Sequence, residues 1–154
     1  MDAIRQITSF TIDHDKLLPG LYVSRVDGDV TTYDLRTRRP NTGDLMDNAT
    51  MHSLEHMFAT FVRNGALADQ IVYFGPMGCQ TGFYLLVRDA DNNAVLAEVR
   101  RTLERTLEYD GPVFGAERKA CGNYINLDLA LAKAEAKRIL DELSARPVTF
   151  TYEE

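Results

Sequence analysis

The stretch LYVSRVDGDVTTYDLR, residues 21–36, decides the fold class that this sequence predicts. Its residues alternate in polarity on both sides of Asp27-Gly28, a dipeptide that favours the tight turn of a β-hairpin. We therefore expect two antiparallel strands in the first quarter of the chain. The polar segment that follows, residues 37–50, contains proline, asparagine and glycine and is typical of a loop.

Apolar residues at helical spacing predict three helices beyond this hairpin: about Thr50–Gly65, Ala94–Tyr109 and Asp128–Leu143. Two short β-rich runs, Ile71–Phe74 and Phe83–Val87, predict strands, and the alternating tail VTFTY predicts a closing strand. Because strands and helices do not alternate regularly, we expect an α+β protein. A single domain over residues 1–154 would then pack a largely antiparallel sheet against about three to four helices.

The composition excludes several classes of function. The net charge is −6 and no basic run offers phosphates a surface, so we expect no nucleic-acid partner. No window approaches about 18 consecutive apolar residues, so no membrane-spanning helix is expected. The N-terminus lacks the pattern of a secretory signal, which favours a cytoplasmic location with Cys79 and Cys121 as free thiols. Such cysteines are most often small buried apolar residues.

Three polar side chains in MHSLEH, residues 51–56, indicate a metal site within the first expected helix. His52 and His56 are two of only three histidines in the chain, and Glu55 lies between them. A helix turns about 100° per residue, so the three share one face, at the border of the apolar stripe. Histidines four positions apart can bind one metal ion, and we favour this interpretation over a solvated polar patch.

Two histidines leave such a site incomplete, because catalytic metals usually take three protein ligands. The spacing alone does not choose the third ligand among His14, Cys79, Cys121 and several carboxylates. The form H-x-x-E-H also matches the inverted motif of zinc metallopeptidases. In that alternative Glu55 activates a metal-bound water, and a downstream glutamate such as Glu135 completes the site.

Five segments occur in the order and spacing of one family: SFTIDH (9–14), YDLRTRRPN (33–41), HSLEH (52–56), GPMGCQTGFY (75–84) and ACGNY (120–124). On these motifs the chain resembles the S-ribosylhomocysteine lyases, the LuxS family of autoinducer-2 synthesis. The resemblance runs from about residue 9 to the third expected helix. It implies cleavage of S-ribosylhomocysteine to homocysteine and 4,5-dihydroxy-2,3-pentanedione, a reaction that serves the methyl cycle and quorum sensing.

The resemblance also implies the cofactor and the reacting groups. His52, His56 and Cys121 correspond to the family's ligands for one divalent metal per subunit. That metal is Fe(II) in the native form, and zinc or cobalt readily replaces it. Two imidazoles and a thiolate suit such borderline-soft ions. Glu55 and Cys79 correspond to the acid/base pair that moves protons during the reaction.

Three further residues correspond to the family's substrate contacts: Ser9, His14 and Arg36. The resemblance implies a homodimer with its active sites at the interface, where these three residues reach in from the partner subunit. Arg36 suits an anionic group such as the substrate's carboxylate, although pairing with Asp34 is an alternative. Near Tyr73 the chain departs from the family pattern, in which some members carry an aspartate that contacts substrate.

Overall fold

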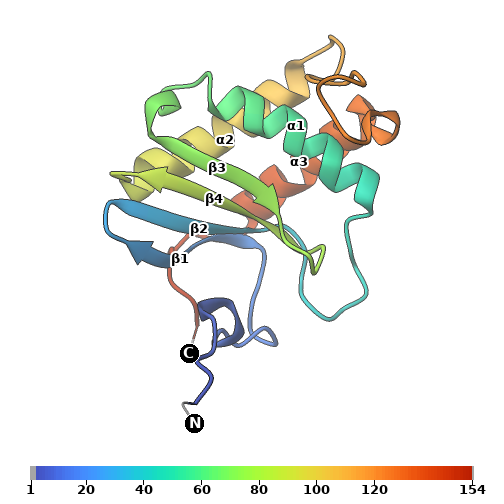
Figure 1. Cartoon of the computed structure of the whole chain (residues 1–154). Helices are drawn as coiled ribbons and strands as arrows, with labels where there is room; N and C mark the ends of the chain where they lie inside the picture. The colour runs from blue at the N-terminus through green and yellow to red at the C-terminus, as the bar shows by residue number, and fades with distance from the viewer. Residues whose placement is uncertain (1–2, 154) are drawn as a thin grey trace.

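Figure 1 shows a computed structural model of the chain, which describes residues 3–153. The two ends of the expected domain 1–154, residues 1–2 and 154, lie outside the described residues. The described elements are the strands β1 (Gly20–Asp27), β2 (Val30–Arg36), β3 (Ile71–Pro76) and β4 (Gly82–Arg88), the helices α1 (Asn48–Val62), α2 (Asn92–Glu108) and α3 (Leu129–Ala145), and the short 3₁₀ helices η1 (Thr8–Phe10), η2 (Ala68–Gln70) and η3 (Tyr124–Asn126).

The strands form one sheet in the order β1-β2-β4-β3, and each neighbouring pair is antiparallel. The α+β class predicted from the sequence is therefore confirmed. The first hairpin turns at Gly28, whose φ of 60° is the left-handed conformation that glycine adopts without strain. The sheet order places β2 beside β4, with Arg36 opposite Gly82, so the end of β2 lies next to the turn between β3 and β4.

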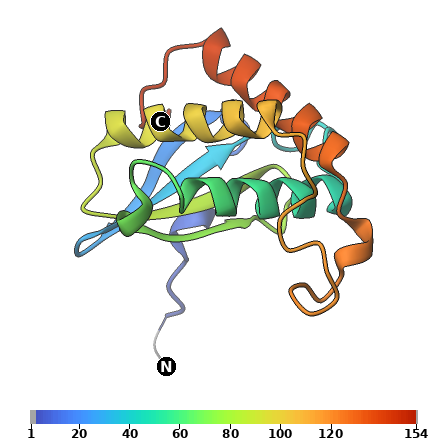
Figure 2. The same ribbon diagram turned by 90° about the horizontal axis from the view of Figure 1, so that it is seen from above.

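One face of the sheet forms the core with the helices. Side chains alternate along β2 and β4, so the cross-strand partners Leu35 and Phe83 both point to this face. They pack in one buried cluster with Leu54 and Phe58 of α1 and with apolar residues of α2 and α3. All three α-helices lie over this face of the sheet (Figures 1 and 2). The opposite face carries no α-helix and is called the helix-free face.

Each α-helix begins at an aspartate whose carboxylate accepts an N–H of the first turn. For α1 this cap is Asp47, which accepts from the Thr50 backbone N–H at 2.7 Å. Asp91 and Asp128 cap α2 and α3 in the same way. Within residues 3–153, none of the helices combines the length and the apolar character that crossing a bilayer requires.

The expected closing strand at the tail is wrong. Residues 147–153 run beside β1 (Figure 1) but make only one parallel bridge, in which the Val23 N–H donates to the Phe150 carbonyl at 2.8 Å. Phe150 has a φ of 64°, which an extended strand does not allow. The alternation in VTFTY reflects contact with the core instead, because Val148 and Phe150 pack against the main cluster.

Candidate metal centre

Three side chains from two parts of the chain converge near the start of α1. His52 and His56 lie on consecutive turns of α1, and Cys121 lies in the irregular segment between α2 and α3. One ligand atom from each residue lies within 4.8 Å of the other two. The Nε2 atom of His52 and the Sγ atom of Cys121 are 3.2 Å apart. Two ligands of one tetrahedral zinc ion would be separated by about 3.5 Å, so this group fits a metal.

The two imidazole rings are held in the orientation that a metal requires. The Nδ1 atom of His52 lies 2.6 Å from the side-chain oxygen of Asn126, and that of His56 lies 2.7 Å from the Phe114 carbonyl. Because both partners are acceptors, each Nδ1 donates, and each Nε2 keeps the lone pair with which a metal is bound. Asn126 is itself fixed, since its amide donates to Asn48 at 2.7 Å.

The segment between α2 and α3 approaches α1 closely because it is built from tight turns. The Cys121 N–H donates to the Glu117 carbonyl at 3.0 Å, which turns the thiol toward α1. The Asn123 N–H donates to the sulfur at 3.4 Å. Gly115 has a φ of 69°, and a Cβ there would lie 3.2 Å from the Nδ1 atom of His56. A larger residue at 115 would therefore push the segment away from the histidines.

Glu55 lies beside the three converging side chains. It projects from α1 next to His56, is partly exposed, and lines a hollow with Phe74 and Phe114. The group of potential ligands among residues 3–153 does not include its carboxylate. Glu55 therefore lies next to the three potential ligands without belonging to them.

Cys79 lies in the turn between β3 and β4 and is exposed, and Cys121 is half-buried, so neither is the fully buried apolar cysteine that is most common. Its sulfur lies 3.0 Å from the hydroxyl of Thr81 and 3.8 Å from the Nη1 atom of Arg36. Arg36 is 3% exposed, and its Nη1 also donates to Thr81 at 2.8 Å. The sulfur of Cys79 therefore faces the buried guanidinium of Arg36.

Arg36 is already paired within its own chain. Its Nε and Nη2 atoms donate to the two carboxylate oxygens of Asp34 at 3.1 and 2.7 Å. Burial alone would lower the pKa of Arg36. The charge and the hydrogen bonds of the Asp34 carboxylate act in the opposite direction, and the pKa of Arg36 is raised above its ordinary value. The pairing with Asp34 that the sequence left open is thus present, and only Nη1 is directed toward Cys79.

The other two predicted substrate contacts lie in different places. His14 lines a cavity with Cys79 and Thr81, and its Nδ1 donates to the Ile12 carbonyl at 2.9 Å. Ser9 lies in η1 and lines a hollow on the helix-free face of the sheet, together with Tyr73. Among residues 3–153, no hydrogen bond joins either residue to the three potential metal ligands.

The metallopeptidase alternative is not favoured by the position of Glu135. This glutamate is 3% exposed and pairs with both the Nε and the Nη2 of Arg38, the Nε contact being 3.2 Å long. It does not belong to the group of potential ligands found among the described residues. Both of its oxygens are engaged in holding α3 to the segment after β2.

The fold and the converging side chains define an α+β protein with two histidines and one cysteine placed where they could hold a metal ion. A family model described as S-ribosylhomocysteinase (LuxS) matches residues 7–148. The S-ribosylhomocysteine lyase of Clostridium beijerinckii is 44% identical over 146 residues, covering 91% of this chain and 92% of the relative. That of Clostridium acetobutylicum is 43% identical over 150 residues, covering 92% and 95%. That of Borreliella afzelii is 42% identical over 147 residues, covering 92% and 94%. This chain belongs to the LuxS family.

Proposed function

We propose that this chain cleaves S-ribosylhomocysteine to homocysteine and 4,5-dihydroxy-2,3-pentanedione, the precursor of autoinducer-2. The observation that carries the proposal is the convergence of His52, His56 and Cys121, with Glu55 unligated beside them. It occurs in a chain whose relatives are named for this lyase activity.

The substrate explains why both a metal and proton-moving groups are needed. A thioether is a poor leaving group on an unactivated sugar, so the carbonyl has to move from C1 to C2 and then to C3. Each move takes a proton from one carbon and returns one to its neighbour. Removal of a proton from C4, next to the new carbonyl, then expels the homocysteine thiolate from C5 by β-elimination. When bound, a divalent ion would polarise the sugar oxygens and stabilise the negative charge that develops on them.

The proton transfers are assigned to Glu55 and Cys79. A carboxylate and a thiolate are both able to act as general base and then as general acid. Arg36 and Thr81 hold the sulfur of Cys79 from one side, which leaves its exposed side for substrate. His14 lines the same cavity and is placed to contact a sugar hydroxyl.

We propose Fe(II) as the native metal, with zinc or cobalt as substitutes. The support is the donor set of two imidazoles and one thiolate, which suits these ions and disfavours magnesium or calcium. We propose the cytoplasm as the compartment, because Cys79 and Cys121 are free thiols. The reaction would there serve both the methyl cycle and autoinducer-2 synthesis for quorum sensing.

We further propose a homodimer that covers the helix-free face of the sheet. Exposed apolar side chains support it: Tyr73 of β3 is 50% exposed, and Ile7 and Phe10 of the N-terminal segment are 57% and 69% exposed. Ile7 and Tyr73 line one hollow on this face, and such patches mark interaction sites. In this dimer, Ser9, His14 and Arg36 would complete the active site of the partner copy, together with Cys79, which shares a cavity with His14 and contacts Arg36.

The proposed activity is tested by incubating the metal-loaded chain with S-ribosylhomocysteine and measuring free thiol. Glu55→Gln keeps the size of the side chain but cannot exchange a proton. We expect it to lower thiol release by about 100-fold or more while the metal stays bound. Unchanged thiol release in this variant would contradict the role of Glu55, and cleavage of peptides by the wild type would support the peptidase instead.

A further inference from the structure

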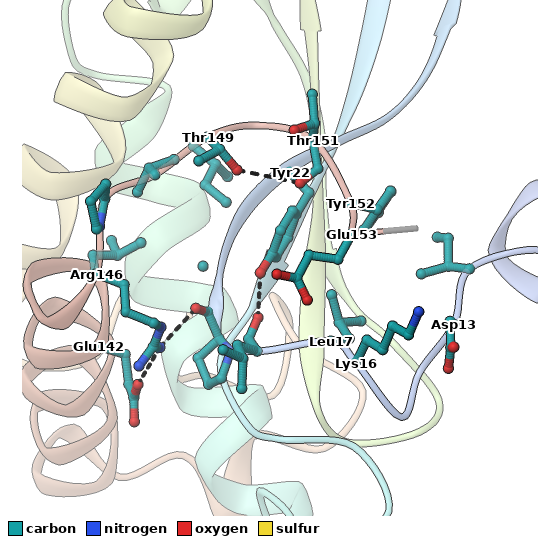
Figure 3. Close-up of a pocket in the computed structure, with 18 residues that line it drawn as sticks. Asp13, Lys16, Leu17, Tyr22, Glu142, Arg146, Thr149, Thr151, Tyr152 and Glu153 are labelled. Atoms are coloured by element: carbon teal, nitrogen blue, oxygen red, sulfur yellow. Dashed lines mark hydrogen bonds and ion pairs between the residues drawn. The ribbon is translucent and has the colours of Figure 1, made fainter.

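The C-terminal segment forms one wall of a cavity at the edge of the sheet. Residues 147–153, the segment before β1 and the end of α3 enclose it (Figure 3). Two tyrosines from different ends of the chain meet at this cavity. The ring of Tyr152 stacks on that of Tyr22 in β1, with centroids 4.9 Å apart and planes 13° from parallel. The stack fixes where the Tyr152 ring lies against the helix-free face of the sheet.

The hydroxyl of Tyr152 reaches a buried carboxylate on β2. It donates to Oδ2 of Asp34 at 2.8 Å, across 118 positions of sequence. Asp34 is only 1% exposed, so its oxygens depend on protein partners. Burial and then the charge of Asp34 raise the pKa of Tyr152 well above its ordinary value. Its hydroxyl therefore stays protonated and remains a donor throughout the neutral range.

Asp34 in turn sets the orientation of Arg36. The guanidinium is planar, and its Nε and Nη2 atoms, along one edge, donate hydrogen bonds to the carboxylate of Asp34. Once that edge is fixed, the position of Nη1 follows, and Nη1 faces Thr81 and Cys79. Oδ2 of Asp34 accepts hydrogen bonds both from Arg36 and from Tyr152. The Tyr152 hydroxyl therefore helps to fix the carboxylate oxygen that orients the Arg36 guanidinium.

We infer that Tyr152 is a positioning residue for Cys79, acting through the buried contacts Tyr152–Asp34–Arg36. This inference rests on the proposed role of Cys79 in proton transfer. Without the hydroxyl, Oδ2 of Asp34 loses a partner that water cannot easily replace in a buried site. The carboxylate and the guanidinium are then free to shift, and the cation no longer lies at a fixed distance from the sulfur.

Tyr152→Phe tests this inference, with Tyr22→Phe as the matched control. Both variants remove one hydroxyl from the same ring stack, but the Tyr22 hydroxyl donates to the Leu18 carbonyl at 2.7 Å instead of to Asp34. The direct readout is the rate at which iodoacetamide alkylates Cys79 in the metal-loaded protein at fixed pH, with the modified peptide identified by mass spectrometry. This readout separates Cys79 from Cys121, and it does not depend on turnover.

We expect Tyr152→Phe to slow the alkylation of Cys79 and to lower kcat, each by about three- to tenfold. Metal content should stay at the wild-type level, and Tyr22→Phe should alkylate at the wild-type rate. Alkylation at the wild-type rate in Tyr152→Phe would overturn the inference, even if the thermal midpoint fell. An equal slowing in Tyr22→Phe would also overturn it. The effect would then come from disturbing the ring stack that the two tyrosines share, and not from the contact of Tyr152 with Asp34.

The failure of this inference can be distinguished from the failure of the proposed function. If Cys79→Ala still released thiol from S-ribosylhomocysteine, the role of Cys79 itself would be wrong, and the inference would fall with it. If Cys79→Ala were inactive while Tyr152→Phe matched the wild type in both alkylation and kcat, only the positioning role of Tyr152 would be wrong.

Discussion

The Nε2 atom of His52 lies 3.2 Å from the Sγ atom of Cys121, although 69 positions separate the two residues. Two features of the fold produce this approach. Tight turns after Gly115 bring the cysteine to α1, and Asn126 holds the His52 ring from the other side. The ligand geometry thus depends on residues that are not ligands themselves, and the first prediction concerns one of them.

Asn126→Ala should weaken metal binding by about 10- to 100-fold, because such changes next to a ligand release its ring from a fixed orientation. Competition against a chelator of known affinity measures the effect. Asn123→Ala is the control from the same segment, since Asn123 contacts the Cys121 sulfur through its backbone N–H and keeps this contact when its side chain is removed. Equal affinities in the two variants would contradict the role of Asn126.

Asp47→Ala should destabilise the fold by about 1 kcal/mol, because it removes the cap of the helix that carries His52 and His56. For a chain of this size the thermal midpoint should fall by roughly 2–4 °C. Asp47→Asn should behave like the wild type at neutral pH, since asparagine caps equally well.

The same cap predicts a pH dependence. The hydrogen bond from the Thr50 N–H lowers the pKa of Asp47 below its ordinary value. The ionised carboxylate therefore stabilises the folded state above the unfolded value of about 3.9, and this contribution is lost as the pH falls through the lower folded value. The difference in thermal midpoint between wild type and Asp47→Ala should shrink on acidification, and a difference that stayed constant would contradict this sign.

Glu135→Gln should destabilise the fold by about 3 kcal/mol, because Arg38 loses its buried countercharge and keeps only the more exposed Asp44. Metal content should be unchanged. Asp141→Asn, on the same helix, breaks an exposed pair with Lys137 and should cost about 0–1 kcal/mol. Loss of metal in Glu135→Gln would instead support the peptidase alternative, in which this glutamate is a ligand.

The proposed dimer predicts complementation between two inactive chains. Cys121→Ala lacks a metal ligand, and His14→Ala lacks a substrate contact that we assign to the opposite subunit. When the two are co-expressed, half of the dimers are mixed and each mixed dimer holds one intact site. About a quarter of wild-type turnover should therefore return. If both residues served the same subunit's site, no activity would return.

Local patterns predicted the elements of the fold well. The alternation around Asp27-Gly28 identified the first hairpin, and helical spacing identified α1 with its histidines at the edge of the apolar stripe. These features depend on neighbours in sequence. The tail was predicted wrongly because alternation in VTFTY arises from packing against the core, while Phe150 adopts a left-handed conformation that no local pattern indicated.

Less of the candidate site than of the fold could be predicted from the sequence. Spacing placed His52, Glu55 and His56 on one face, but only the resemblance selected Cys121, because the path of residues 109–128 carries no periodic signal. The contact between Arg36 and Cys79 follows from the register of β2 with β4, which joins positions 43 residues apart. The roles of Asn126 and Tyr152 were not predicted, because no local sequence pattern indicates their contacts with the distant residues His52 and Asp34.

The most direct test is thiol release from S-ribosylhomocysteine, with metal content measured in the same anaerobically prepared samples of wild type, Cys79→Ala and Cys121→Ala. We predict that the wild type binds about one divalent metal per chain and releases thiol. Cys79→Ala should keep the metal and release no thiol, and Cys121→Ala should lose the metal. A metal-loaded wild type that released no thiol, or a Cys121→Ala variant with undiminished metal content, would contradict the account.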